Sequence, residues 1–239
     1  MDREYIAKRL TENGIPFHPE LPDMLETDLR LLQEWNGKMD LTAVEGEEDL
    51  LDKHIMDSLT VLKTDLIPKG ASLIDVGTGA GFPGLILAMA RPDLQVTLLD
   101  AQQKRLTFLE AAAKEAKVQN VRLVHARAED GGQNPALREH FDVAAARAVA
   151  PLSVLCEYLL PYVRVGGKAL CWKGPALEEE RETGRRAAFL LGGKAEEEIR
   201  CPVTGRDWDH RILPILKTAP TPKKYPRRAG VPKSSPLGS

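Results

Sequence analysis

A glycine-rich stretch at residues 73–84 constrains the fold more than any other part of the chain. It begins with a mostly apolar, β-favouring run, Leu73–Val76, which predicts a short buried strand. Three glycines follow within five residues and remove the β-carbons that would keep a ligand away from the backbone. The apolar run at 85–89 then predicts a helix that ends before Pro92. A strand, a glycine loop and a helix in this order predict a site for a nucleotide-like ligand.

The glycine spacing indicates which ligand class this loop suits. A dinucleotide fingerprint reads G-x-G-x-x-G, whereas this chain has Gly77, Gly79 and Gly81, with Asp75 two residues before the first glycine. A carboxylate there disfavours a pyrophosphate but could hold a cationic or amino group. The stretch resembles motif I of the class I S-adenosylmethionine-dependent methyltransferases. An NAD-dependent oxidoreductase is the competing interpretation, and the glycine spacing argues against it.

From residue 71 onward, apolar β-favouring runs alternate with helical patterns, which is typical of an α/β fold with a parallel sheet. We expect a Rossmann-like, mostly parallel seven-stranded sheet, with a loop opening at Gly131 and Gly132. The expected strands are 72–76, 95–99, 121–125, 141–146 and 168–172, with antiparallel additions at 195–201 and 212–217.

Three segments differ in composition. Residues 1–67 are predicted to form an N-terminal helical cap, 68–217 the α/β domain, and 218–239 a basic, proline-rich, extended arm. Residues 20–52 carry eleven acidic and two basic side chains, whereas 217–239 carry six basic side chains and no acidic ones. This asymmetry predicts an anionic partner for the C-terminal arm.

Ligands of open parallel sheets bind beyond the carboxyl ends of the strands. Asp100 follows the second strand, where its carboxylate could accept hydrogen bonds from a ribose diol. Glu129 follows the third strand and could accept an adenine amino group. Arg147 follows the fourth within an apolar run, so it must meet an anion or line a cleft. Lys173 ends the fifth strand on the same rim.

Other patterns carry less functional information. His54 and Asp57 share a helix face, where we expect a surface hydrogen bond or capping contact rather than a catalytic pair. The three cysteines are widely spaced, which predicts free buried thiols in a reducing cytoplasm and no metal site. No secretory signal or membrane-spanning apolar run is present in the sequence, so we expect a cytoplasmic protein. No obligate protein partner is evident.

Together the motifs resemble the bacterial 16S ribosomal RNA guanine-N7 methyltransferase G family, also called the glucose-inhibited division protein B family. The resemblance covers nearly the whole chain. Its most specific parts are the run Ala146–Leu152 and the tail 221–232. The other matching stretches are Trp35-Asn36 with Leu41-Thr42, Lys53-His54 with Asp57–Leu59, Asp75–Gly84, Lys104-Arg105 with Phe108–Glu110, Arg127–Glu129, and Lys173-Gly174. In one departure, Asp40 stands where the family usually has asparagine.

The resemblance implies a methyltransferase that uses S-adenosylmethionine, with 16S rRNA of the small ribosomal subunit as its substrate. Family and strand-end positions together make the predicted cofactor-binding residues Asp75, Gly77, Gly79, Gly81, Phe82, Asp100, Ala101, Ala128, Glu129 and Arg147. Guanine N7 already has a free lone pair, so we name no general base; Arg147 and Lys173 are candidates for positioning the nucleotide.

Basic residues around a tyrosine in the tail are typical of an arm that follows an RNA backbone and stacks on a base. The predicted RNA-binding residues are Lys173, Lys223, Lys224, Tyr225, Arg227 and Arg228. A tail that merely packs along the domain is the simpler reading. Two further functions stay open: a non-catalytic RNA-binding ribosome assembly factor, and a methyltransferase acting on small molecules or proteins.

Overall fold

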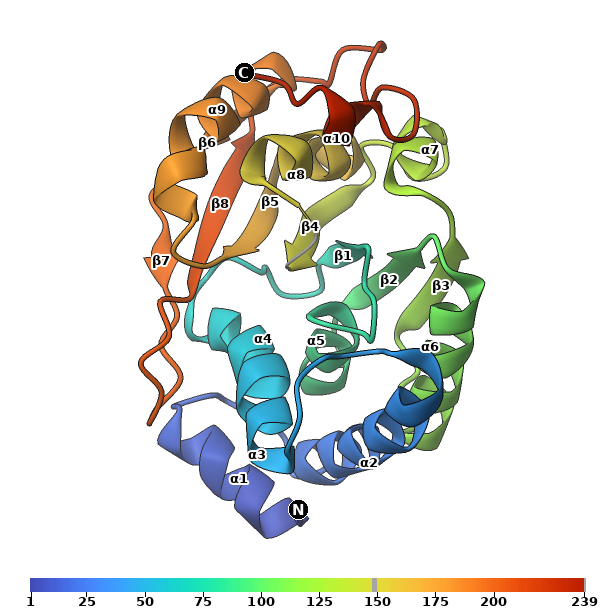
Figure 1. Cartoon of the computed structure of the whole chain (residues 1–239), viewed down its shortest axis with the longest axis vertical. Coiled ribbons are helices and arrows are strands. Elements are labelled where there is room, and N and C mark those ends of the chain that lie inside the picture. Colours follow the sequence, from blue (N-terminus) through green and yellow to red (C-terminus); the bar gives the residue numbers. More distant parts are fainter. Residues whose placement is uncertain (148–149, 239) are drawn as a thin grey trace.

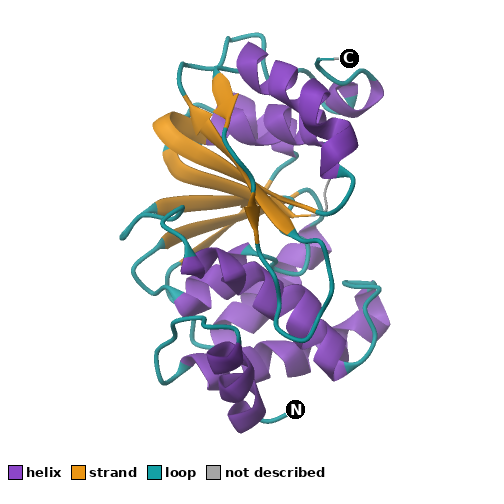
Figure 2. Ribbon diagram, turned by 90° about the vertical axis from the view of Figure 1, so that its left-hand side faces the viewer, coloured by secondary structure: helices purple, strands orange, loops and turns teal. Residues whose placement is uncertain are grey.

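A twisted sheet lies between two layers of helices in the computed structural model, which describes residues 1–147 and 150–238 (Figure 2). Within these residues the sheet has eight strands in the order β3-β2-β1-β4-β5-β8-β6, with β7 paired to β8. Their bounds are β1 (Ser72–Val76), β2 (Gln95–Asp100), β3 (Val121–His125), β4 (Phe141–Arg147), β5 (Val163–Lys173), β6 (Gly193–Ala195), β7 (Ile199–Arg200) and β8 (Arg211–Lys217). The predicted Rossmann-like, mostly parallel sheet is therefore confirmed.

Strands β1 to β5 pair in parallel, whereas β8 runs antiparallel to β5, β6 and β7. The antiparallel additions were predicted, but the expected strand at 195–201 is divided into β6 and β7. Because β1, β2 and β4 have their carboxyl ends at one edge, the loops that follow them meet there. This edge is where the polar strand-end residues gather.

The sheet is apolar on both faces, as parallel sheets covered by helices are. Leu73 and Leu98 face one apolar cluster, whereas their neighbours Ile74 and Leu99 face the other. The first cluster packs under α1 (Arg3–Glu12), α2 (Leu21–Met39), α3 (Glu47–Leu50), α4 (Asp57–Leu59), α5 (Gly84–Ala90) and α6 (Gln103–Glu115). The second packs under α7 (Ala128–Gln133), α8 (Leu152–Leu159), α9 (Leu177–Leu190) and α10 (Val231–Ser234), seen at the top of Figure 1.

The N-terminal helices share their apolar core with the sheet. Leu10 and Leu25 belong to the same buried cluster as Leu73, and the Trp35 ring lies 5.7 Å from that of Phe108 in α6. The helical run from Glu47 to Lys63 is continuous, with a π-helical turn between α3 and α4. The predicted boundary at residue 67 therefore remains a proposal. It divides the chain by composition, and residues on both sides of it contribute to one apolar cluster.

Two local expectations are wrong. Gly131 and Gly132 do not open a loop but belong to α7, because their missing side chains let this helix pack closely. A β-carbon on Gly132 would lie 2.8 Å from Cγ of Pro226. The tail, in turn, is not a free extended arm: it folds back over α7 and α8 and contains α10 (Figure 1).

Cys156, Cys171 and Cys201 are free and buried, as expected. Over the part of the chain that the structure describes, no helix is both long and apolar enough to cross a membrane.

Candidate functional site: two clefts that meet at Arg147

The glycine loop between β1 and α5 is held from below by Asp75. Its carboxylate is fully buried, and Oδ2 accepts hydrogen bonds from the Thr78 hydroxyl (2.7 Å) and the Gly84 amide (2.8 Å). A β-carbon on Gly84 would lie 2.6 Å from Cβ of Asp75, so only glycine lets the helix start this close. Asp75 therefore shapes the loop.

The other carboxylate oxygen of Asp75, Oδ1, is buried and has no hydrogen-bond partner among the described residues. Burial raises the pKa of Asp75 to about 6, although the bonds from Thr78 and Gly84 oppose the rise.

A first cleft opens above this loop at the carboxyl ends of β1, β2, β3 and β4. Of the ten predicted cofactor-binding residues, eight line it: Gly77, Gly79, Phe82, Asp100, Ala101, Ala128, Glu129 and Arg147. Asp75 and Gly81 are not in the lining. Gly81 instead packs below, where a β-carbon would lie 2.8 Å from Cβ of Leu85. The strand-end rule thus brings residues from four separate segments to one cavity.

Asp100 ties the loop to the second strand. Its Oδ2 accepts the Gly79 amide at 3.0 Å and a longer contact from Nη1 of Arg105 at 3.4 Å. Its Oδ1 accepts the Gln102 amide at 2.8 Å. A carboxylate has about four lone-pair sites, so Asp100 keeps capacity for a hydroxyl in the cleft.

Arg147 is held in place by Asp57 and His54. Its Nη1 donates to Oδ2 of Asp57 at 3.1 Å and to the Lys53 carbonyl at 2.7 Å, and its Nη2 contacts Nδ1 of His54 at 2.8 Å. The guanidinium also lies 5.1 Å from the centre of the Phe82 ring. From the sequence we expected Arg147 to meet an anion or to line a cleft, and the anion is Asp57.

The expected surface hydrogen bond between His54 and Asp57 is wrong. Both side chains point to Arg147, and Asp57 is only 3% exposed. Burial, with a further contribution from Arg147, lowers the pKa of His54 to about 3. The ring is therefore neutral, and since arginine only donates, Nδ1 accepts and Nε2 carries the hydrogen that faces Oγ1 of Thr42 at 2.7 Å.

Phe82 and His54 form a stacked pair in the lining of the first cleft, with ring centres 4.6 Å apart and planes inclined by 14°. A second cleft adjoins the first and is lined by Lys53, His54, Asp57, Arg147, Trp172, Lys173, Gly174, Ala176 and His210. His54 and Arg147 line both clefts. The two cavities are thus neighbours that share a wall of planar groups.

Lys173 lines the second cleft, but its ammonium is already paired. Nζ lies 2.5 Å from Oε2 of Glu180, and it donates to the Ala150 carbonyl at 3.3 Å. Ala148 and Val149, which belong to the motif Ala146–Leu152, lie outside the described residues. Lys53, by contrast, has a cation–π contact with Trp208, whose ring centre is 5.5 Å from Nζ.

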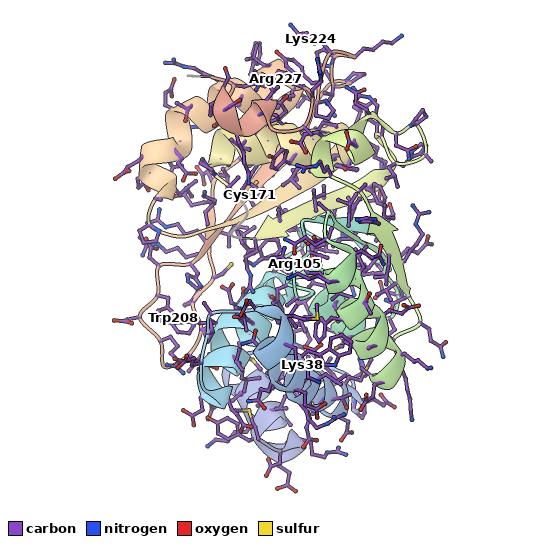
Figure 3. All side chains as sticks on the ribbon, turned by 45° about the vertical axis from the view of Figure 1, so that its right-hand side comes forward. Lys38, Arg105, Cys171, Trp208, Lys224 and Arg227 are labelled. Carbon is purple, nitrogen blue, oxygen red and sulfur yellow. The ribbon has the colours of Figure 1, made fainter. Side chains whose placement is uncertain are left out.

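The predicted RNA-binding residues of the tail fall into two groups. Tyr225 is buried and Arg227 is paired with Glu157, whereas Lys223, Lys224 and Arg228 are exposed. In Figure 3, Lys224 and Arg227 are seen at the top of the molecule, with Arg105 nearer its centre.

Several lining residues were missed by sequence reasoning. Lys53 and His210 line the second cleft, and Gly230 and Lys233 line the first. Lys53 and Gly230 lie within the stretches that resemble the family, and Lys233 directly follows one of them. This resemblance could have identified them from the sequence. His210 had no such signal, because it reaches the site only through the loop before β8, where its Nδ1 lies 2.8 Å from Oδ1 of Asp57.

Asp40 has a structural explanation. It ends α2 with φ 49° and ψ 54°, in the left-handed region. Asparagine and aspartate are the non-glycine residues that adopt this conformation most readily, so either can stand here. Beside it, Asn36 clamps Thr42 through two hydrogen bonds of 2.8 and 2.9 Å, which holds Thr42 against His54.

Comparison with known families agrees with this geometry. The family profile named rRNA small subunit methyltransferase G matches residues 23–206. The chain belongs to this family. Ribosomal RNA small subunit methyltransferase G of Alkaliphilus oremlandii is 47% identical over 207 residues, 87% of each chain. The protein of the same name from Clostridium beijerinckii is 42% identical over 234 residues, 98% of each chain.

Solved structures support the fold. Fibrillarin from Aeropyrum pernix, determined with natively bound S-adenosyl-L-methionine, superposes with a TM-score of 0.52 at 14% identity, over 67% of this chain and 73% of that one. A SAM-dependent methyltransferase from Aquifex aeolicus gives a TM-score of 0.52 at 18% identity, over 70% and 93%. The class I methyltransferase fold is thus confirmed, and the oxidoreductase interpretation is not favoured.

Proposed function

We propose that the protein transfers the methyl group of S-adenosylmethionine to N7 of a guanine in 16S rRNA of the small ribosomal subunit. Membership of the methyltransferase G family supports the reaction and the substrate class. The single observation that carries the assignment of the site is that a nucleoside-sized cleft and a cation-lined cleft meet at His54 and Arg147.

The first cleft suits the cofactor. Asp100 would accept hydrogen bonds from the ribose hydroxyls, and Glu129, which is 5% exposed, would face the adenine edge. The loop Gly77–Gly81 presents bare backbone, which lets a ligand approach closely. The buried, unpartnered Oδ1 of Asp75 adds negative charge beneath the loop, which favours a cofactor with a sulfonium and an ammonium group over a pyrophosphate.

The second cleft suits the guanine. N7 and O6 of guanine are hydrogen-bond acceptors on the same edge of the base. Lys53 would supply a cationic donor for O6, while N7 keeps its lone pair free for the methyl group. Lys173, paired with Glu180, adds positive charge to the cleft lining, and the neutral His54 ring adds none. Asp57 keeps Arg147 in position from below.

Catalysis by these residues is a matter of positioning. S-adenosylmethionine, when bound, supplies an electrophilic methyl group. Guanine N7 attacks with its own lone pair, so no residue has to remove a proton first. The chain's part is to orient the base where the two clefts meet, beside His54 and Arg147, which raises the effective concentration of the two reactants. This accounts for a site that is built around an arginine rather than around an acid–base pair.

Exposed cations on the C-terminal tail would meet the RNA backbone. Lys223, Lys224 and Arg228 on the tail, together with Lys233 at the mouth of the first cleft, are candidates. Tyr225 and Arg227 are engaged in packing the tail, so we assign them to its placement and not to direct contact with RNA.

Methyl transfer to rRNA tests the proposal. The protein is incubated with small-subunit rRNA and S-adenosylmethionine labelled in the methyl group, and the labelled nucleotide is mapped. The expected product is 7-methylguanine at one position. Asp100→Asn should reduce transfer by weakening cofactor binding, whereas the matched control Asp65→Asn should not, because exposed Asp65 precedes β1 at the opposite edge of the sheet. Label on another atom of the RNA, or none, would overturn the proposal.

A further inference from the structure

The last part of the chain is attached to the domain over much of its length. We call residues 221–234 the C-terminal strap. At its start the Thr221 amide donates to Oε1 of Glu139 at 2.7 Å, and Arg138 donates to the carbonyls of Thr221 and Tyr225, both at 2.7 Å. Gln133 in α7 donates to the Pro226 carbonyl at 2.8 Å. These bonds satisfy backbone groups that a free arm would leave to water.

The centre of the strap is held by a buried ion pair. Glu157 in α8 is fully buried, and both of its oxygens accept hydrogen bonds from the Arg227 guanidinium, the shortest at 2.6 Å. Oε1 also accepts the Arg227 amide at 2.8 Å. A buried carboxylate is costly to leave without its cationic partner, so Glu157 strongly favours the docked strap.

Beyond this anchor the strap reaches the cofactor cleft. The Gly230 amide donates to Oε1 of Glu129 at 2.9 Å, and both Gly230 and Lys233 line the first cleft. The helix α10, which contains Lys233, packs on α8. The residue predicted to face the adenine is thus bonded directly to the tail.

We propose that the C-terminal strap is a wall of the cofactor site, so that cofactor binding and docking of the strap reinforce each other. The inference rests on the proposed function of the first cleft. Gly230 orients Glu129, and Lys233 closes the mouth of the first cleft. The Arg227–Glu157 ion pair keeps Gly230 and Lys233 in these positions. Lys223, Lys224 and Arg228 stay exposed on the same strap, so an RNA that binds them also stabilises the cofactor site.

A purely RNA-binding tail makes a different prediction. In that case each tail cation would contribute to RNA binding according to its charge, and none would affect the cofactor. Arg227 and Arg228 are adjacent arginines that separate the two cases, because Arg227 binds Glu157 whereas Arg228 is exposed with no ion pair among the described residues.

The test measures the affinity of the full chain for S-adenosylmethionine by calorimetry. Arg227→Ala is expected to weaken binding on the order of 10-fold, which lies in the usual range for coupled sites. Arg228→Ala removes the same charge and is expected to leave cofactor affinity unchanged while weakening RNA binding. Since Arg227→Ala leaves Glu157 unpaired, a second variant lacking residues 230–239 keeps the Arg227–Glu157 anchor and removes the wall together with the end of the chain that packs on α9. It should show a similar loss.

The reciprocal effect is read by limited trypsin digestion. Bound S-adenosylhomocysteine should slow cleavage after Lys224 and Arg228 in the natural chain. Equal cofactor affinity in the natural chain, the Arg227→Ala chain and the truncated chain would overturn this inference and leave the proposed function intact. A natural chain that binds no S-adenosylmethionine would overturn both.

Discussion

Asp28 in α2 is a buried carboxyl whose titration should lower the free energy of unfolding as the pH rises from about 4 to slightly above neutral. The side chain is fully buried, and neither oxygen has a hydrogen-bond partner among the described residues. Burial raises its pKa from the ordinary value of 3.8 to about 7. In the unfolded chain the same group ionises near its ordinary value, so the folded and unfolded states hold different numbers of protons between these two pH values.

The sign follows from proton binding. Between pH 3.8 and about 7 the folded chain keeps the Asp28 proton and the unfolded chain has lost it. Unfolding therefore releases a proton, and raising the pH favours the unfolded state. Below pH 3.8 the stabilisation that comes from the protonated, buried Asp28 is fully present. It is lost as the pH rises through the pKa of about 7 that Asp28 has in the folded chain. The total loss is about 4 kcal/mol, of which about 2 kcal/mol falls between about pH 5.5 and about pH 8.

Asp28→Asn removes the titration while keeping the shape of the protonated form. The free energy of unfolding in urea should fall between about pH 5.5 and about pH 8 by about 2 kcal/mol more in the natural chain than in the variant. All other titrating groups are common to both proteins and cancel in the difference. Asp23→Asn, at an exposed position near the start of the same helix, is the control and should keep the natural pH dependence. Parallel pH profiles for the natural chain and Asp28→Asn would refute the reasoning.

Two further predictions concern glycine packing and the arginine cluster. Gly84→Ala should prevent stable folding, because its β-carbon would lie 2.6 Å from that of Asp75. Gly37→Ala, in the last turn of α2 where a β-carbon meets open space, should instead raise the free energy of unfolding by about 0.5–1 kcal/mol. Urea unfolding measures both, and a stably folded Gly84→Ala protein would contradict the packing argument. Asp57→Ala should lower the free energy of unfolding by about 3–5 kcal/mol, because it leaves the Arg147 guanidinium buried and unpaired. Urea unfolding tests this as well. A loss below about 1 kcal/mol would show that the ion pair with Asp57 does not hold Arg147.

Much of the site could be predicted because parallel strands end at a common edge. Gly77, Asp100, Glu129 and Arg147 are far apart in sequence, yet each follows or ends a strand that could be recognised from its local pattern. The alternation of strands and helices then implied that these ends converge. The positions therefore follow from local pattern and topology alone.

The partners of these residues could not be predicted in the same way. Nothing in the spacing of His54, Asp57 and His210 relates them to Arg147. Their contacts join the helical layer to the end of β4 and to the loop before β8, ninety or more residues away. Two polar residues three positions apart on a helix, such as His54 and Asp57, favour a hydrogen bond with each other. Here both side chains instead bind the buried guanidinium of Arg147.

The tail shows the same division. Its composition alone determined that it is basic, proline-rich and unable to form a long helix, and the glycine loop alone predicted a site for a nucleotide-like ligand. Only the tertiary structure decided that the tail and the glycine loop line one cleft. The reason is physical: whether a charged residue faces solvent or a buried partner depends on what lies opposite it. Here Arg227 has Glu157 opposite it, whereas its neighbour Arg228 has solvent.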